Sequence, residues 1–138
     1  MTETLLQVNN LKTYLHLAGG VVKAVDGVSF NIEKGKTMGV VGESGSGKSM
    51  TASSIIRLLP PNTGKIESGN IIFDGRDVLS FTKKELLNFR GKDIAVIFQD
   101  PMSSLDPVFK VGDQMSEMIC AHQNVSAEEA RKIAVDSP

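Results

Sequence analysis

The chain has 138 residues, within the usual size of one domain, and 41% of them are hydrophobic, which excludes a chain that is disordered throughout. Fifteen basic against sixteen acidic residues leave a formal net charge of -1, which argues against a general nucleic-acid binder. The single cysteine excludes an internal disulfide, and no apolar run approaches the roughly 20 residues of a membrane helix, so we expect a soluble, cytoplasmic chain that is at most peripheral to a membrane.

The first part of the chain predicts strands followed by a helix. Two apolar stretches, 5–17 and 21–32, are separated by two glycines and predict a β-hairpin. After a turn, residues 37–41 are apolar on both faces and predict a central strand. Beyond a glycine-rich segment, apolar residues at helical spacing predict a helix that ends before two prolines; they are Ala52, Ile55, Ile56 and Leu59.

The rest of the chain mixes short strands and helices. Residues 66–73 predict a strand, 82–89 a short polar helix closed by a glycine, and 93–99 another apolar strand that stops at Asp100-Pro101. Helical patterns follow at about 111–123 and 127–135. Ser126 stands three residues before Glu129, the spacing of a capping box at the start of the last helix.

The segment with the clearest chemistry is GESGSGKS at 42–49, which matches the P-loop pattern G-x-x-x-x-G-K-[ST] in full. The glycines let successive backbone N–H groups point inward and form a nest for phosphate oxygens at the positive end of the next helix. Lys48 supplies a mobile positive charge for the β- and γ-phosphates, and the Ser49 hydroxyl is suited to ligate Mg²⁺. We therefore predict that nucleotide phosphates contact Gly42, Glu43, Ser44, Gly45, Ser46, Gly47, Lys48, Ser49 and Met50.

Two blocks further along narrow the class of protein. One strand ends in IAVIFQDP at 94–101, and MSSLDP follows directly at 102–107. With the P-loop, these blocks resemble the ATP-binding subunits of ABC transporters, in particular those of oligopeptide, dipeptide and nickel importers. AVDGVSF at 24–30 and SGNIIFDG at 68–75 are similar to early strands of that family. The resemblance covers essentially the whole chain.

The resemblance implies roles that the P-loop alone does not. Gln99 is expected in the family's Q-loop, where it reaches Mg²⁺ and the attacking water, so we class Lys48 and Gln99 as catalytic and Ser49 and Gln99 as metal-binding. Tyr14, the only tyrosine, corresponds to the aromatic residue that stacks on adenine. The implied cofactors are ATP and Mg²⁺. The implied partners are transmembrane permease subunits, a second ATP-binding subunit, identical or a sister chain, and indirectly an external substrate-binding protein.

The resemblance also implies a fold and its divisions. We expect an α/β P-loop NTPase core that is incomplete, with an antiparallel β part at 1–36, the P-loop core at 37–99, and the Q-loop and start of a helical subdomain at 100–138. No Asp-Glu pair for a Walker B strand, no LSGGQ-like signature and no switch histidine are present in the sequence. The chain thus resembles the N-terminal part of a longer ATPase subunit, located at the cytoplasmic face of the membrane. We expect it to hydrolyse little ATP alone, and an unpaired central strand to leave it marginally stable or self-associating.

Two alternatives remain open at this point. A self-contained P-loop kinase or GTPase-like enzyme would use Asp100 as its metal carboxylate. A non-hydrolytic fragment would act only as a nucleotide-dependent docking module. In the helix predicted at 111–123, Met115 and Met118 stand three residues apart and predict packing within the protein, with a partner-binding face as the alternative.

Overall fold

The structure is a computed structural model that describes residues 3–100 and 104–136. It divides into two compact units, residues 1–86 and 87–138, and each is described here by itself. In the part of the chain that the structure describes, the first unit contains an antiparallel sheet, helix α1, the short turn η1 and the start of α2, and the elements of the second unit are helices. This content fits a partial P-loop NTPase core that carries an antiparallel β part, as the sequence predicts.

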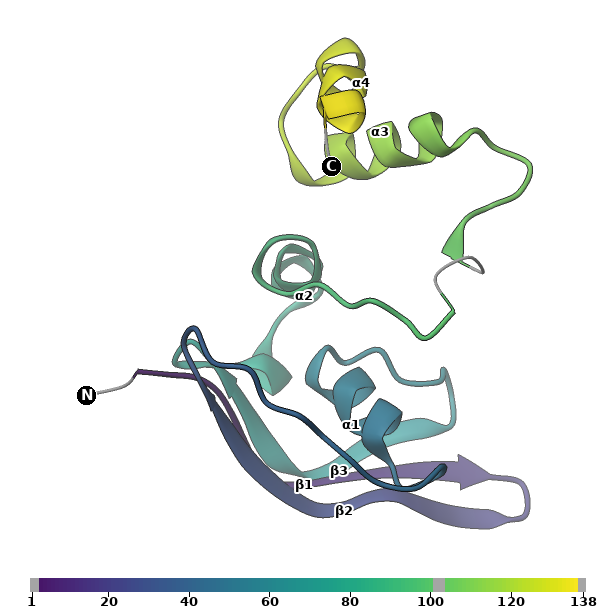
Figure 1. The fold of residues 1–138 in the computed structure, drawn as a ribbon. Coiled ribbons are helices and arrows are strands. Elements are labelled where there is room, and N and C mark those ends of the chain that lie inside the picture. The colour runs from purple at the N-terminus through teal and green to yellow at the C-terminus, as the bar shows by residue number, and fades with distance from the viewer. Residues whose placement is uncertain (1–2, 101–103, 137–138) are drawn as a thin grey trace. The chain divides into compact units, whose positions relative to one another are not determined.

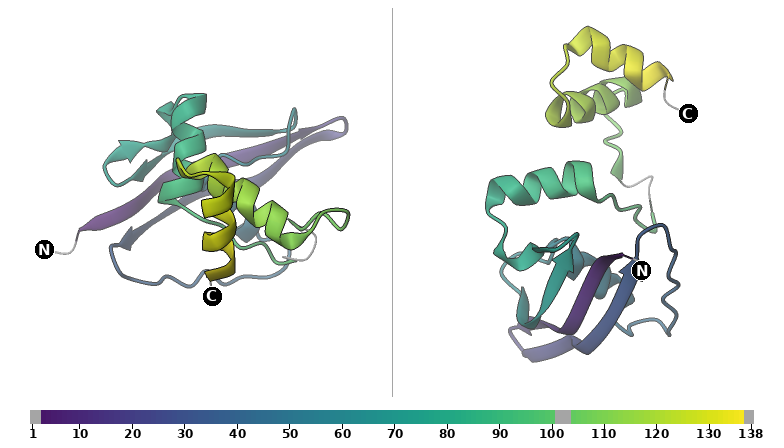
Figure 2. Two further views of the ribbon diagram at one scale, coloured as in Figure 1. Left: turned by 90° about the horizontal axis from the view of Figure 1, so that it is seen from above. Right: turned by 90° about the vertical axis from the view of Figure 1, so that its left-hand side faces the viewer.

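The first unit is organised around a four-stranded antiparallel sheet in the order β2-β1-β3-β4. β1 (Thr4–Leu17) and β2 (Gly20–Glu33) form the long, curved hairpin visible in Figures 1 and 2. β3 (Gly64–Phe73) pairs with the other edge of β1, and β4 (Arg76–Asp77) completes the sheet. The predicted hairpin and the predicted strand at 66–73 are confirmed, and the antiparallel sheet extends well beyond residue 36.

Helix α1 (Lys48–Ile55) packs on one face of this sheet (Figure 1). The covered face carries the apolar core, which includes Val8, Leu11 and Val25. Thr13 is fully buried there, and its hydroxyl lies 2.8 Å from the Ser54 hydroxyl of α1. Ser54 already donates its one proton to the Met50 carbonyl at 2.6 Å, so Thr13 must be the donor between the two hydroxyls.

Helix α1 ends earlier than the sequence predicts. It stops at Ile55, because Arg57 adopts a left-handed conformation with φ of 54°. The Leu58 N–H donates to the Ser53 carbonyl and the Arg57 N–H to the Ser54 carbonyl, which is the Schellman pattern of helix termination. The predicted turn containing Leu59 is therefore absent from the helix, and the two prolines lie beyond its end.

The predicted central strand at 37–41 is wrong for this structure. The segment is not in a strand, and Val41 is 95% exposed. A strand that is apolar on both faces needs neighbours along its edges and layers over its faces. Among the residues that the structure describes, no strand pairs with this segment, so its backbone has no ladder to join.

Helices make up the second unit. Helix α2 (Lys83–Asn88) leads from the first unit into it, close to the predicted range 82–89, and is followed by a π-helical turn, η2 (Phe89–Asp93). The helices predicted at 111–123 and 127–135 are confirmed as α3 (Val111–His122) and α4 (Ala127–Asp136), which pack together (Figure 1).

The strand predicted at 93–99 is also wrong. Its first residue, Asp93, closes η2, and residues 94–99 are not in a strand. Ile97 is 92% exposed and Phe98 49% exposed. As at 37–41, the apolar pattern calls for a buried strand, but the described residues provide no neighbouring strand.

Candidate functional site

The loop at 42–47 places a positive charge inside its own curve. The Lys48 ammonium donates to the carbonyl oxygens of Gly42 at 2.6 Å and Glu43 at 2.7 Å, and lies 3.2 Å from the Ser46 hydroxyl. In the described part of the chain, no carboxylate lies within ion-pair distance of Lys48. The charge is thus held in place by neutral oxygens and remains available to an anion.

The start of α1 adds the second element of an anion site. Gly47 is its N-cap, no side chain caps the helix, and no acidic residue stands in its first turn. The exposed Ser49 follows Lys48 in that turn, where its hydroxyl is accessible to a ligand. The uncapped amides and the positive end of the helix therefore meet the Lys48 charge in one place, as phosphate binding requires.

Two glycines give the loop its curvature. Gly45 and Gly47 adopt φ of 82° and 91°, which residues with side chains rarely do. A Cβ built on Gly47 would collide with the Ala24 carbonyl oxygen of β2, whereas one built on Gly45 would meet open space. The loop therefore lies directly against β2 at Gly47 and is free at Gly45. The residues present fit a nucleotide triphosphate, because the loop combines bare backbone with an uncompensated cation.

Tyr14 lies on β1, on the sheet face opposite α1. Its hydroxyl donates to Asp26 at 2.9 Å, and the Lys23 ammonium lies 5.6 Å from the ring centroid. The hydrogen bond to Asp26 raises the pKa of Tyr14, and the same bond, with help from Lys12, lowers the pKa of Asp26. The predicted role of Tyr14 as the adenine platform stays a prediction.

Gln99 lies in the second unit, and its side chain is exposed. Asp100 beside it is also exposed, and the next residues of the predicted Q-loop, Pro101, Met102 and Ser103, lie outside the described residues. The roles predicted for Gln99 toward Mg²⁺ and water therefore stay predictions. No group of three or more His, Cys, Asp or Glu side chains that could hold a metal ion occurs within residues 3–100 and 104–136.

The second unit contains an apolar hollow that the sequence indicates only in part. It measures about 540 Å³ and combines residues of α3 with the segment before it, namely Ser104, Leu105, Gln114, Met115, Met118 and Ile119. Met118 is 66% exposed, so the two methionines face this hollow and solvent rather than a packed core. Gln114 was not predicted as a functional residue; its side chain accepts from the Asp106 N–H and donates to the Asp106 and Phe109 carbonyls.

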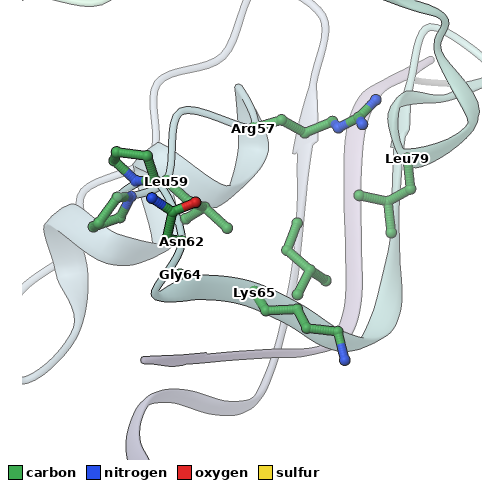
Figure 3. A pocket seen from close by; sticks show the side chains of 9 residues that line it. Arg57, Leu59, Asn62, Gly64, Lys65 and Leu79 are labelled. Atoms are coloured by element: carbon green, nitrogen blue, oxygen red, sulfur yellow. The ribbon is translucent and has the colours of Figure 1, made fainter. Parts of the chain in front are cut away.

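A further hollow, of about 460 Å³, lies beside the end of α1 (Figure 3). The Arg57 side chain extends across it toward the segment that carries Leu79 (Figure 3). Its guanidinium donates to the carbonyls of Val78 at 3.3 Å and Phe81 at 2.9 Å. Arg57 thus ties α1 to the turn η1 (Val78–Ser80), and its donors are directed at the protein's own backbone.

Family comparison agrees with this arrangement. The family model for ABC transporters matches residues 25–136, which is most of the chain. The chain belongs to the ABC transporter family. Its matched region includes the P-loop and Gln99, the two segments on which the predicted resemblance rests.

Among curated relatives, the similarity is to peptide transport proteins. The oligopeptide transport ATP-binding protein OppD of Bacillus subtilis is 46% identical over 96% of this chain and 37% of its own length. The dipeptide transport ATP-binding protein DppD of the same organism is 47% identical over 94% of this chain and 39% of its own length. OppD of Salmonella typhimurium is 44% identical over 91% of this chain and 37% of its own length. The chain thus spans about two fifths of the relatives' length.

Solved structures support the fold. A dimeric ATP-binding cassette bound to ADP and phosphate superposes with a TM-score of 0.80 at 24% identity, over 96% of this chain and 55% of the other. A second dimeric structure, of a bacterial ABC transporter cassette, gives the same values. Within the described ranges, no helix of this chain combines the length and the apolar character needed to cross a membrane.

Proposed function

We propose that this chain binds Mg²⁺-ATP at the loop 42–49 and belongs to an ATPase subunit that powers the uptake of peptides by an ABC transporter. The observation that carries the proposal is the Lys48 ammonium, held by the Gly42 and Glu43 carbonyls at the uncapped start of α1. An anionic group entering this loop gains both the charge and the helix amides without displacing a carboxylate. The names of the relatives support peptides as the cargo.

Two residues are proposed for the metal. The exposed Ser49 hydroxyl is next to Lys48 in the first turn of α1 and would hold Mg²⁺ bound to the phosphates. The amide of Gln99 would contact the metal and the attacking water, since a neutral amide can both donate and accept without a change of charge. When bound, Mg²⁺ would neutralise the negative charge that develops on the phosphates during phosphoryl transfer to water.

The hollow on α3 is proposed to receive the permease. Leu105, Met115 and Met118 give it a flexible apolar lining, which suits a helix presented by a membrane protein. A second ATP-binding subunit is proposed because the solved cassettes are dimeric. The chain would then act at the cytoplasmic face of the membrane, with an external binding protein delivering the peptide to the permease.

The kinase or GTPase alternative with Asp100 as the metal ligand finds no support in the family match. The docking alternative differs from the proposal only in turnover, so the two are separated by measuring phosphate release. We expect the 138-residue chain to bind nucleotide and to release negligible phosphate on its own. Steady release by the isolated chain at a rate that Lys48→Ala abolishes would overturn this expectation.

Calorimetric titration of the full chain with ATP and Mg²⁺ tests the loop directly. Lys48→Ala is expected to remove measurable binding, because it deletes the one positively charged side chain of the loop 42–49. Lys36→Ala is the matched control, since this exposed lysine precedes the loop but lies outside the motif. Equal affinity in the wild type and Lys48→Ala would show that the loop is not the nucleotide site.

A further inference from the structure

Thr51 is a buried residue of α1, four positions after the helix N-cap. It is 9% exposed, so its hydroxyl needs a partner within the protein. That partner is the carbonyl oxygen of Gly47, which accepts from the Thr51 hydroxyl at 2.9 Å and from the Thr51 N–H at 2.8 Å. The last carbonyl of the loop 42–47 is therefore held by two donors from one residue.

This carbonyl shares a rigid peptide plane with the N–H of Lys48. The two groups point in opposite directions, so a carbonyl directed into α1 turns the Lys48 N–H outward from the start of the helix. The uncapped amides and the Lys48 ammonium meet on that outward side. The Thr51 hydroxyl thus fixes the direction of an N–H group that the proposed phosphate site uses.

A glycine precedes this peptide plane, so the plane needs more support than an ordinary helix start. Gly47 has φ of 91° and ψ of 3°, and no Cβ restricts rotation of its backbone. The bond from the Thr51 N–H is the ordinary first bond of a helix, where helices fray. A second donor on the same oxygen restricts the plane, so less conformational entropy is lost when a phosphate binds. It also polarises the peptide, which strengthens the Lys48 N–H as a donor.

Ser54 makes the same kind of bond about one turn later, but on a different peptide plane. Its hydroxyl donates to the Met50 carbonyl at 2.6 Å. That plane carries the N–H of Thr51, which already donates to Gly47 within the helix. The Ser54 bond therefore contributes to α1 without directing an N–H toward the loop.

From this contrast we infer that Thr51 is a positioning residue for nucleotide phosphates: its hydroxyl orients the Lys48 N–H and thereby raises the affinity of the loop for them. Thr51 is itself buried beneath the loop and lies beyond the pattern at 42–49 by which the sequence predicts the site. The inference rests on the proposed function, because it takes the phosphates to bind in the loop.

Inorganic triphosphate with Mg²⁺ tests the inference on the full chain, because this probe reaches the phosphate site without a base. Thr51→Val removes the hydroxyl but keeps a β-branched side chain of similar shape. In calorimetry it is expected to weaken triphosphate binding roughly fivefold, the equivalent of about 1 kcal/mol. Thr51→Ser keeps the hydroxyl and is expected to restore binding. Ser54→Ala is the matched control: it should lower the free energy of unfolding and leave triphosphate affinity unchanged.

The amide resonance of Lys48 separates positioning from a general loss of structure. In isotope-labelled chain saturated with triphosphate, a hydrogen bond from this N–H is expected to move its proton signal downfield. The displacement should be smaller in Thr51→Val than in the wild type, Thr51→Ser or Ser54→Ala, because the N–H is then less well aligned with a phosphate oxygen.

The outcomes distinguish this inference from the proposed function. Wild-type triphosphate affinity in Thr51→Val, or equal losses in Thr51→Val and Ser54→Ala, would overturn the positioning role and leave the loop as the phosphate site. Triphosphate binding that survives Lys48→Ala would instead overturn the loop itself, and the inference with it. If Thr51→Val does not fold, Thr51→Ala decides, since alanine is the best helix former and also lacks the hydroxyl. Wild-type affinity in that variant would overturn the inference.

Discussion

Substitution of Gly47 tests whether the loop is held against β2 as the structure shows. Gly47→Ala must place a Cβ at a φ of 91° and against the Ala24 carbonyl oxygen. The left-handed backbone costs an alanine about 1–2 kcal/mol. The collision with backbone that cannot rotate away adds about 1–3 kcal/mol, the usual cost of overpacking. The total of about 2–5 kcal/mol is a large share of the roughly 5–15 kcal/mol that stabilises an ordinary domain.

Gly45→Ala is the matched control for this effect. Its φ of 82° imposes similar backbone strain, but its Cβ would meet open space. The two variants should therefore differ by the collision alone, about 1–3 kcal/mol. Urea unfolding followed by circular dichroism measures the difference, which at a slope of roughly 2 kcal/mol per M moves the midpoint by about 0.5–1.5 M. Equal midpoints for the two variants would refute the contact between Gly47 and Ala24.

Three further predictions concern the sheet and the last helix. Ser54→Ala should destabilise the chain by about 2 kcal/mol and Thr13→Val by about 1 kcal/mol, because only Ser54→Ala leaves a buried donor, the Thr13 hydroxyl, without its acceptor. Urea unfolding measures both free energies, and the reverse order would contradict the assignment of Thr13 as the donor. The Tyr14 phenol should titrate above its ordinary pKa, since its hydrogen bond to Asp26 favours the neutral form. The stability that this bond contributes is present below the ordinary pKa of tyrosine and is lost as the pH rises through the raised pKa. The absorbance of tyrosinate measures the pKa of Tyr14, and Asp26→Asn should lower that pKa toward its ordinary value. Ser126 donates from its N–H and its hydroxyl to Glu129, and these bonds lower the pKa of that carboxyl, so the cap is present at neutral pH and is lost as the pH falls through the lowered pKa. In Ser126→Ala, NMR titration should show the pKa of Glu129 raised toward its ordinary value. An unchanged pKa would count against the capping box.

Local patterns in the sequence determined those parts of the protein whose partners are close along the chain. The hairpin follows from two apolar runs around a pair of glycines, and α4 follows from the capping box at Ser126 together with its apolar face. The glycine-rich turn before α1 is equally local, because its glycines, Lys48 and the start of α1 stand within eight residues, while its role in binding phosphate stays a prediction. Such features need no distant segment, so the residues alone were sufficient to predict them.

Tertiary structure decided what depends on distant neighbours. The apolar runs at 37–41 and 94–99 have the composition of buried strands, yet Val41 and Ile97 are almost fully exposed, because a strand forms only where another strand supplies its hydrogen bonds. Composition likewise singled out Tyr14 as the one tyrosine but could not tell which face of the sheet its ring would occupy. That face is set by the contact of Thr13 with Ser54, 41 positions further along the chain, since a helix packed on one side of a strand fixes the direction of every alternate side chain.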